Sequence, residues 1–157
     1  MNIALIGLGS MGYNLAKNMV SKNYQVNAFE KNMLIVENIK NDNIQNLYLL
    51  NSIQDLVDKT PSPRIIMLSL PADKIDKCIN DLIDHLNPTD IIADLGNSLY
   101  LKSMEREKLL SRFNISFLGI GVSGGPRGAK NGPAIMAGGS KNACENVKKI
   151  FEDISAK

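Results

Sequence analysis

The fold of this chain is decided by a glycine-rich stretch near its N-terminus, Gly7-Leu8-Gly9-Ser10-Met11-Gly12. The stretch follows directly on a short apolar run, Asn2–Gly7, whose length is typical of a strand buried on both faces of a sheet. After it, Leu15 and Met19 fall on one face of a helix that we expect from about Met11 to Lys22. A helix N-terminus that opens on glycines offers free N–H groups and a partial positive charge, which together favour the binding of a phosphate.

The spacing of these glycines, G-x-G-x-x-G, is typical of a dinucleotide-binding turn when it lies between a strand and a helix. The first glycine permits the tight turn, the second lets the backbone approach a pyrophosphate, and the third lets the helix pack on the strand. A purely structural glycine turn is the alternative, and the strand–turn–helix context argues against it. The sequence therefore predicts a dinucleotide site here.

Beyond this turn, short apolar strands alternate with amphipathic helices, which is the pattern of a parallel sheet covered by helices on both faces. Further strands are expected at Gln25–Phe29, Leu47–Leu50, Arg64–Leu70, Asp90–Ala93, Ile115–Leu118 and Pro133–Ala137. Further helices are expected at Met33–Lys40, after the cap candidate Ser52, and at Ala72–His85, Leu101–Arg112 and Lys141–Ile154. Residues Gly119–Gly132 are expected to form a long loop. These elements predict one α/β domain over residues 1–157, with a doubly wound, mostly parallel sheet of the Rossmann type.

The composition excludes several other classes of protein. A net charge of +2 in 157 residues, with basic and acidic side chains interspersed, argues against a nucleic-acid partner. The two cysteines, Cys78 and Cys144, fall in expected helices without CxxC spacing, so neither a metal site nor a disulfide is predicted. His85 is expected at the surface rather than in a catalytic site. No apolar run is long enough to span a membrane and no signal-peptide pattern is present, so we expect a cytoplasmic protein.

The choice of coenzyme depends on the end of the second strand. Glu30 lies there, 18 residues after Gly12, and an acidic side chain at this place normally accepts hydrogen bonds from the adenosine ribose, which favours NAD. The next residue is Lys31, whose charge could bind the 2′-phosphate of NADP, although a solvated surface lysine is an equally good interpretation. The two residues favour different coenzymes, and the sequence leaves both open.

A second glycine-rich segment follows the strand expected at Ile115–Leu118. So many glycines after a late strand indicate a backbone that adopts positive φ or closely approaches another group. Ser123 adds a hydroxyl, and the bare amides of Gly124 and Gly125 could hold an anion. A flexible surface loop is the alternative.

Three motifs give the chain a resemblance to a known family. The first is Gly121-Val122-Ser123-Gly124-Gly125, followed by Gly132-Pro133 and by Ala137-Gly138-Gly139-Ser140. The second is Asp94-Leu95-Gly96-Asn97-Ser98-Leu99-Tyr100, and the third is the ending from Ile150-Phe151 to Ser155-Ala156-Lys157. With the N-terminal glycine turn, they resemble the coenzyme domain of decarboxylating 6-phosphogluconate dehydrogenases over the whole chain. The broader β-hydroxyacid dehydrogenase family shares the turn and the Ser-Gly-Gly loop but generally lacks the Gly-Asn-Ser segment.

The resemblance implies a role for each matching residue. The pyrophosphate turn would be formed by Gly7, Leu8, Gly9, Ser10, Met11 and Gly12. The NADP 2′-phosphate would be bound by Glu30, Lys31 and Asn32, and the coenzyme would be lined further along by Ser69, Leu70 and Pro71. Asn97 would contact both nicotinamide and substrate. The substrate, 6-phosphogluconate, would be bound by Ser123, Gly124 and Gly125.

Some residues depart from the family's pattern. Glu30-Lys31-Asn32 replaces the usual Asn-Arg-Thr, which weakens the inference of NADP, because lysine cannot reproduce a bidentate guanidinium. Leu70 stands where a lysine is common. Pro126-Arg127 replaces Glu-Glu, and proline fixes φ and removes an N–H, so a different loop geometry is expected.

The resemblance also implies a reaction that this chain does not complete. The family oxidises and decarboxylates 6-phosphogluconate in the pentose phosphate pathway, with a lysine base and a glutamate acid in a helical domain that would follow Lys157. We therefore expect no catalytic residue and no metal in this chain, weak coenzyme binding without turnover, and a monomer, although the parent enzyme would be a homodimer. An NAD-dependent β-hydroxyacid dehydrogenase domain and a stand-alone dinucleotide-binding module are the alternatives.

Overall fold

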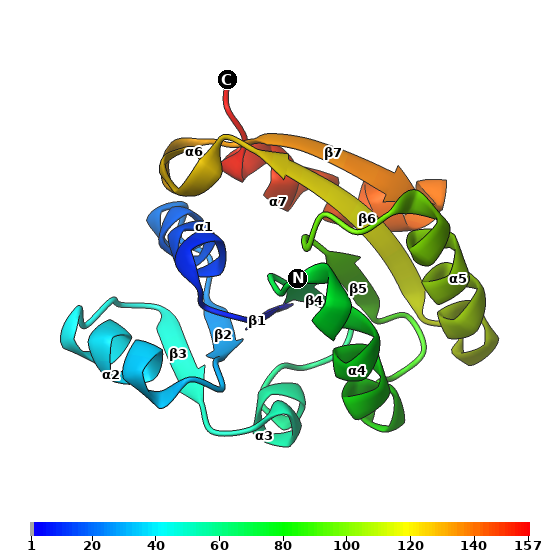
Figure 1. Cartoon of the computed structure of the whole chain (residues 1–157), viewed down its shortest axis with the longest axis horizontal. Helices are drawn as coiled ribbons and strands as arrows, with labels where there is room; N and C mark the ends of the chain where they lie inside the picture. The colour runs from blue at the N-terminus through cyan, green and yellow to red at the C-terminus, as the bar shows by residue number, and fades with distance from the viewer. Residues whose placement is uncertain (1) are drawn as a thin grey trace.

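Seven strands form one sheet in the computed structural model, which describes residues 2–157 (Figure 1). The strands are β1 (Asn2–Ile6), β2 (Val26–Phe29), β3 (Leu47–Leu50), β4 (Arg64–Leu68), β5 (Ile91–Asp94), β6 (Ser116–Ser123) and β7 (Ala134–Gly139). Their order is β3-β2-β1-β4-β5-β6-β7, with β7 antiparallel to β6 and every other pair parallel. From β1 the chain adds strands toward one edge of the sheet as far as β3, and then returns to the other side of β1 to add β4. This change of strand order makes a topological switch point between β1 and β4, and ligands bind at such points in open α/β sheets. The predicted Rossmann-type fold is confirmed.

Helices cover both faces of the sheet, as Figure 1 shows for α1 and α7 on one side and α4 and α5 on the other. The α-helices are α1 (Ser10–Ser21), α2 (Met33–Asn41), α3 (Ile53–Asp58), α4 (Ala72–Leu82), α5 (Tyr100–Leu110), α6 (Gly125–Asn131) and α7 (Lys141–Ile154). Two short 3-10 helices, η1 (Ile83–His85) and η2 (Ser111–Phe113), extend α4 and α5. Among the described residues, no helix has the length and apolar character needed to cross a membrane.

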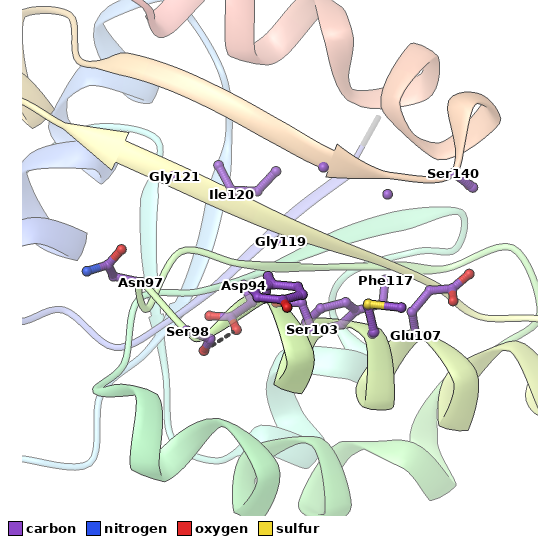
Figure 2. A pocket seen from close by; sticks show the side chains of 14 residues that line it. Asp94, Asn97, Ser98, Ser103, Glu107, Phe117, Gly119, Ile120, Gly121 and Ser140 are labelled. Carbon is purple, nitrogen blue, oxygen red and sulfur yellow. Dashed lines mark hydrogen bonds between the residues drawn. The ribbon is translucent and has the colours of Figure 1, made fainter.

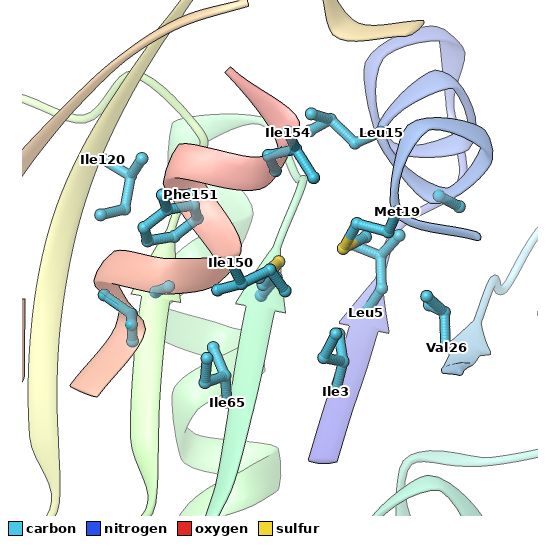
Figure 3. Close-up of a cluster of buried hydrophobic side chains, with 14 of the residues drawn as sticks. Ile3, Leu5, Leu15, Met19, Val26, Ile65, Ile120, Ile150, Phe151 and Ile154 are labelled. Carbon is cyan, nitrogen blue, oxygen red and sulfur yellow. The ribbon is translucent and has the colours of Figure 1, made fainter. Parts of the chain in front are cut away.

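The strands supply both halves of the core because their side chains alternate between the two faces. In β1, Ile3 and Leu5 face α1 and α7, where Figure 3 shows them packed with residues of both helices. Ala4 and Ile6 join the second cluster, which includes residues of α3, α4 and α5. Strand β4 is buried along its whole length, as expected for a central parallel strand.

Two buried polar contacts fix how the elements meet. The amide of Asn18 in α1 donates to the carbonyls of Ala129 (3.1 Å) and Ile154 (2.8 Å), and so joins α1 to α6 and α7. At the amino ends of β4 and β5, the guanidinium of Arg64 donates to the carboxylate of Asp90 at 2.8 Å, with both side chains buried. The Arg64–Asp90 pair therefore lies at the opposite end of the strands from their carboxyl ends, where ligands bind in such sheets.

The prediction of a long loop over Gly119–Gly132 is wrong. Residues 119–123 continue β6, and α6 begins almost immediately after them. The strand continues because β7 pairs with it from Leu118 to Ser123, which gives these residues a hydrogen-bonded neighbour that no local pattern reveals. The other predicted boundaries lie within about two residues of the observed elements, a difference expected at element ends.

Candidate functional site

A cleft of about 690 Å³ opens at the carboxyl ends of the central strands. Five segments line it, namely the turn after β1, the loop after β4, the loop after β5, the end of β6 with the start of α6, and Met136 of β7. Nine residues singled out in the sequence line this cleft: Gly9, Ser10, Met11, Ser69, Leu70, Pro71, Asn97, Ser123 and Gly125. The structure therefore gathers most of the predicted site residues into one place.

The turn after β1 combines two tightly packed glycines with one open one. A Cβ at Gly7 would lie 2.4 Å from the carbonyl oxygen of Ser69, and one at Gly12 would lie 2.0 Å from the carbonyl oxygen of Gly7. Gly7 also has φ of +92°, which favours glycine. At Gly9, by contrast, a Cβ would meet nothing within 4 Å. The turn thus leaves the backbone uncovered at Gly9, as the dinucleotide-binding fingerprint requires of its second glycine.

The same turn leads into α1 without a side-chain cap. Gly9 is the N-cap residue, and no side chain accepts a hydrogen bond from the first turn of the helix. The first N–H groups of a helix need an acceptor from outside the helix. A phosphate in the cleft would satisfy them, so the residues present fit a dinucleotide.

The end of β2 is tied to the glycine turn by Glu30. One carboxylate oxygen accepts the N–H of Leu8 at 2.7 Å, and the other accepts the N–H of Asn32 at 2.8 Å. Asn32 caps α2 by accepting the N–H of Leu34 at 3.0 Å. Lys31 is exposed and forms no ion pair with any of residues 2–157. Glu30 therefore holds two backbone N–H groups, a role that its sequence position did not indicate.

The loops after β4 and β5 touch through their backbones. The N–H of Leu95 donates to the carbonyl of Leu68 at 2.9 Å, and a Cβ at Gly96 would lie 2.5 Å from the carbonyl oxygen of Leu70. Asn97 follows with φ of +57°, in the left-handed region that asparagine tolerates better than most residues. The two loops thus form one packed unit beside the glycine turn.

The second glycine segment meets the cleft where β6 ends. Ser123 is the last residue of β6 and is exposed, and Gly124 and Gly125 follow it with φ of +126° and +59°. Pro126 lies in the first turn of α6, where a missing N–H costs no helical hydrogen bond. The positive φ values expected for this segment are confirmed, and the proline fits a short helix rather than disturbing a loop.

A second hollow of about 580 Å³ adjoins the cleft, between α5 and the paired strands β6 and β7. Figure 2 shows Asn97 near one end of it and Glu107 with Ser140 near the other. Asn97 and Gly121 line both hollows. Asn97 therefore lies where the two cavities meet.

The ionisable groups expected to be inactive lie away from both hollows. His85 is exposed in η1, and Cys78 is buried in α4, where burial raises the pKa of its thiol to about 12. Within residues 2–157, no three histidine, cysteine or acidic side chains are grouped as a metal site would require. Two buried residues that were not predicted as functional, Asp94 and Arg106, lie beneath the turn that carries Asn97.

Comparison with known proteins places these features in a family. A family model described as the NAD binding domain of 6-phosphogluconate dehydrogenase matches residues 2–157. A decarboxylating 6-phosphogluconate dehydrogenase from Buchnera aphidicola subsp. Acyrthosiphon pisum is 41% identical over 157 residues, which cover 99% of this chain and 34% of that protein. The enzyme of that name from Candida albicans is 40% identical over 159 residues, with 99% and 31% covered. The chain thus spans about a third of the length of the curated relatives it matches.

Solved structures agree with this assignment. The 6-phosphogluconate dehydrogenase of Plasmodium falciparum, studied in its apo form, with its cofactor NADP+ and with its substrate 6-phosphogluconate, matches with a TM-score of 0.93 and 34% identity. The match covers 100% of this chain and 34% of that one. A 3-hydroxyisobutyrate dehydrogenase of Mycobacterium tuberculosis has a TM-score of 0.86 at 22% identity, covering 99% of this chain and 52% of its own, and shows the shared fold alone. Fold, motifs and relatives together show that the chain belongs to the 6-phosphogluconate dehydrogenase family, as an NAD-binding domain of that family.

Proposed function

We propose that this chain binds NADP across the cleft and presents the nicotinamide beside a 6-phosphogluconate site. The observation that carries this proposal is the meeting of the open turn at Gly9, the Asn97 turn and Ser123 in one cleft at the switch point. In this arrangement the pyrophosphate lies over Gly9 and the N-terminus of α1. Asn97 contacts the nicotinamide and the substrate, and Ser123, Gly124 and Gly125 bind the substrate.

The preference for NADP over NAD is supported by the residues after β2. Both oxygens of Glu30 already accept main-chain N–H groups, which offsets part of the negative charge that would repel a phosphate. Lys31 is exposed and has no carboxylate partner among residues 2–157, so its charge is available for a 2′-phosphate. Each oxygen of Glu30 keeps further acceptor capacity for a ribose hydroxyl, which is the observation that favours NAD.

Calorimetric titration with NADP and NAD in parallel tests the proposal. We expect NADP to bind at least about tenfold more tightly, which corresponds to ~1.4 kcal/mol. Lys31→Ala should remove most of that difference by lowering the affinity for NADP alone. Lys40→Ala is the matched control, because Lys40 is an exposed lysine in the last turn of α2. Equal or tighter binding of NAD would show that Glu30 governs the choice, and absence of binding by either coenzyme would overturn the proposal.

We also propose that this chain positions its ligands without completing the reaction. Bound NADP would supply the hydride acceptor, but removal of a proton from the substrate needs a positioned base. Of the described residues, none that lines the cleft has an ionisable side chain. Mixing the chain with NADP and 6-phosphogluconate should therefore give no NADPH absorbance above the blank, and sustained NADPH formation would contradict this.

A further inference from the structure

The turn that carries Asn97 is held on both sides by one carboxylate. Asp94, at the end of β5, accepts the N–H of Gly96 through one oxygen at 2.8 Å and the hydroxyl of Ser98 through the other at 2.7 Å. Figure 2 shows Asp94 joined to Ser98, with Asn97 on the same turn. The residues before and after Asn97 are thus fixed to a single buried group, and Asn97 itself is left exposed.

Arg106 in α5 fixes the orientation of that carboxylate. Its Nη1 donates to Asp94 at 2.8 Å and to the hydroxyl oxygen of Ser98 at 2.7 Å, and its Nε donates to Asp76 at 2.6 Å. Arg106 is only 4% exposed and Asp94 only 2%, whereas Asp76 lies at the surface. The guanidinium also holds the pKa of the Asp76 carboxyl below its usual value through this hydrogen bond. The planar, multi-donor head of arginine is what allows one side chain to make these contacts together.

Stability alone is a weak explanation for this network. A buried ion pair is often no more stabilising than apolar residues of similar volume, because both charges lose their hydration. The left-handed backbone of Asn97 also costs about 1 kcal/mol or more and persists only where its neighbours hold it. The network supplies such support, because Asp94 accepts hydrogen bonds from Gly96 and Ser98, the residues on either side of Asn97.

We propose that Arg106 is a positioning residue, which acts through Asp94 and Ser98 to hold Asn97 at the nicotinamide end of the coenzyme. This inference rests on the proposed function, in which Asn97 contacts the nicotinamide. It predicts that disturbing Arg106 weakens ligands that have a nicotinamide and spares those that lack one.

The test compares NADP with 2′,5′-ADP, which has the adenosine and the 2′-phosphate but no nicotinamide. In Arg106→Lys, a single ammonium cannot make all the contacts of the guanidinium. We expect the affinity for NADP to fall about fivefold, the loss of roughly one hydrogen bond, and the affinity for 2′,5′-ADP to change less than about twofold. Ser98→Ala should also lower the affinity for NADP more than that for 2′,5′-ADP, but by a smaller factor. It replaces Arg106→Lys in the test if that variant does not fold.

Arg64→Lys is the matched control, because Arg64 is equally buried and pairs with the buried Asp90 at the opposite end of the strands. It should lower the melting temperature while leaving the ratio of the two affinities unchanged. Asp76→Asn removes only the negative charge of the surface partner, keeps an oxygen that can accept from Nε, and should also leave the ratio unchanged. A loss of both ligands in equal proportion in Arg106→Lys and Ser98→Ala would overturn the inference.

A readout without ligand separates this inference from the proposed function. The side-chain amide resonances of Asn97 in the free protein should shift in Arg106→Lys and Ser98→Ala but not in Arg64→Lys. If the unmodified chain binds neither ligand, the proposed function fails, and these resonances alone decide whether Arg106 positions Asn97. Unchanged Asn97 resonances in both site variants would overturn the inference by themselves.

Discussion

Glycine-rich segments form two walls of the cleft, one over residues 7–12 and the other over residues 119–132, and they use glycine differently. In the first, Gly7 and Gly12 are required by packing, because an added Cβ would lie 2.4 and 2.0 Å from backbone oxygens. In the second, a Cβ at Gly125 would meet nothing within 4 Å, and one at Gly128 would have its nearest neighbour at 3.6 Å. The first segment is therefore restricted by packing at Gly7 and Gly12. The second has open space at Gly125 and Gly128, but it is restricted at Gly124 and Gly132, where φ is positive and an added Cβ would lie 3.1 and 3.0 Å from backbone atoms.

The largest effect should come from Gly12→Ala. Its Cβ would overlap the carbonyl oxygen of Gly7, and α1 could relieve the overlap only by moving off the sheet. We expect a loss of more than ~4 kcal/mol in the free energy of unfolding, enough to abolish folding of a marginal domain. Urea denaturation followed by circular dichroism measures this loss. A cooperative transition at the unmodified midpoint would show that packing does not require this glycine.

Gly9→Ala, three residues earlier, should have the opposite profile. Nothing lies within 4 Å of its Cβ and its φ is −61°, so the free energy of unfolding should change by less than about 0.5 kcal/mol. The methyl group would occupy the space proposed for the pyrophosphate, and the affinity for NADP should fall at least about tenfold. Calorimetric titration measures that fall. Urea denaturation of Gly9→Ala beside Gly12→Ala compares the effects of the two substitutions on stability. Unchanged NADP affinity would show that the pyrophosphate does not bind against Gly9.

The same two segments show what could be predicted from the sequence. The first was predicted in position and form, because its glycine spacing, the preceding strand and the following helix are all local signals. The second was predicted as a loop, since glycines carry no side-chain periodicity and the pairing of β6 with β7 depends on residues further along the chain. Its glycine content nevertheless predicted positive φ, or a close approach to another group, somewhere in the segment, and Gly124, Gly125 and Gly132 have positive φ.

Within the site, sequence reasoning found residues but not the contacts that hold them. Ser69, Asn97 and Ser123 were singled out by motif and line one cleft, although their roles in binding stay predictions. The bond from Leu8 to Glu30 depends on the register of β2 against β1, and the bond from Arg106 to Asp94 depends on how α5 packs. Neither contact leaves a local pattern, because each joins separate elements of the fold.

Gly125→Ala tests whether the second segment is restricted by backbone conformation alone. With φ of +59° and open space around the Cβ, alanine should cost about 1–2 kcal/mol of stability from conformation and nothing from packing. Gly125→Asn is the matched control and should cost less, because asparagine adopts this conformation more readily. Thermal unfolding of both variants measures the difference. Equal losses would point to a side-chain clash instead.

Gly128→Ala should have the smallest effect and the opposite sign. Gly128 lies within α6 without a positive φ, and the nearest atom to an added Cβ is the carbonyl oxygen of Ser123 at 3.6 Å, an ordinary contact distance. Alanine is favoured over glycine in a helix by roughly 0.5–1 kcal/mol, so the free energy of unfolding should rise by about that amount. Urea denaturation measures the rise, with NADP titration as the control for an undisturbed cleft. A loss of stability would mean that α6 approaches its neighbours more closely than these distances indicate, and that packing requires glycine at residue 128 as it does at residue 12.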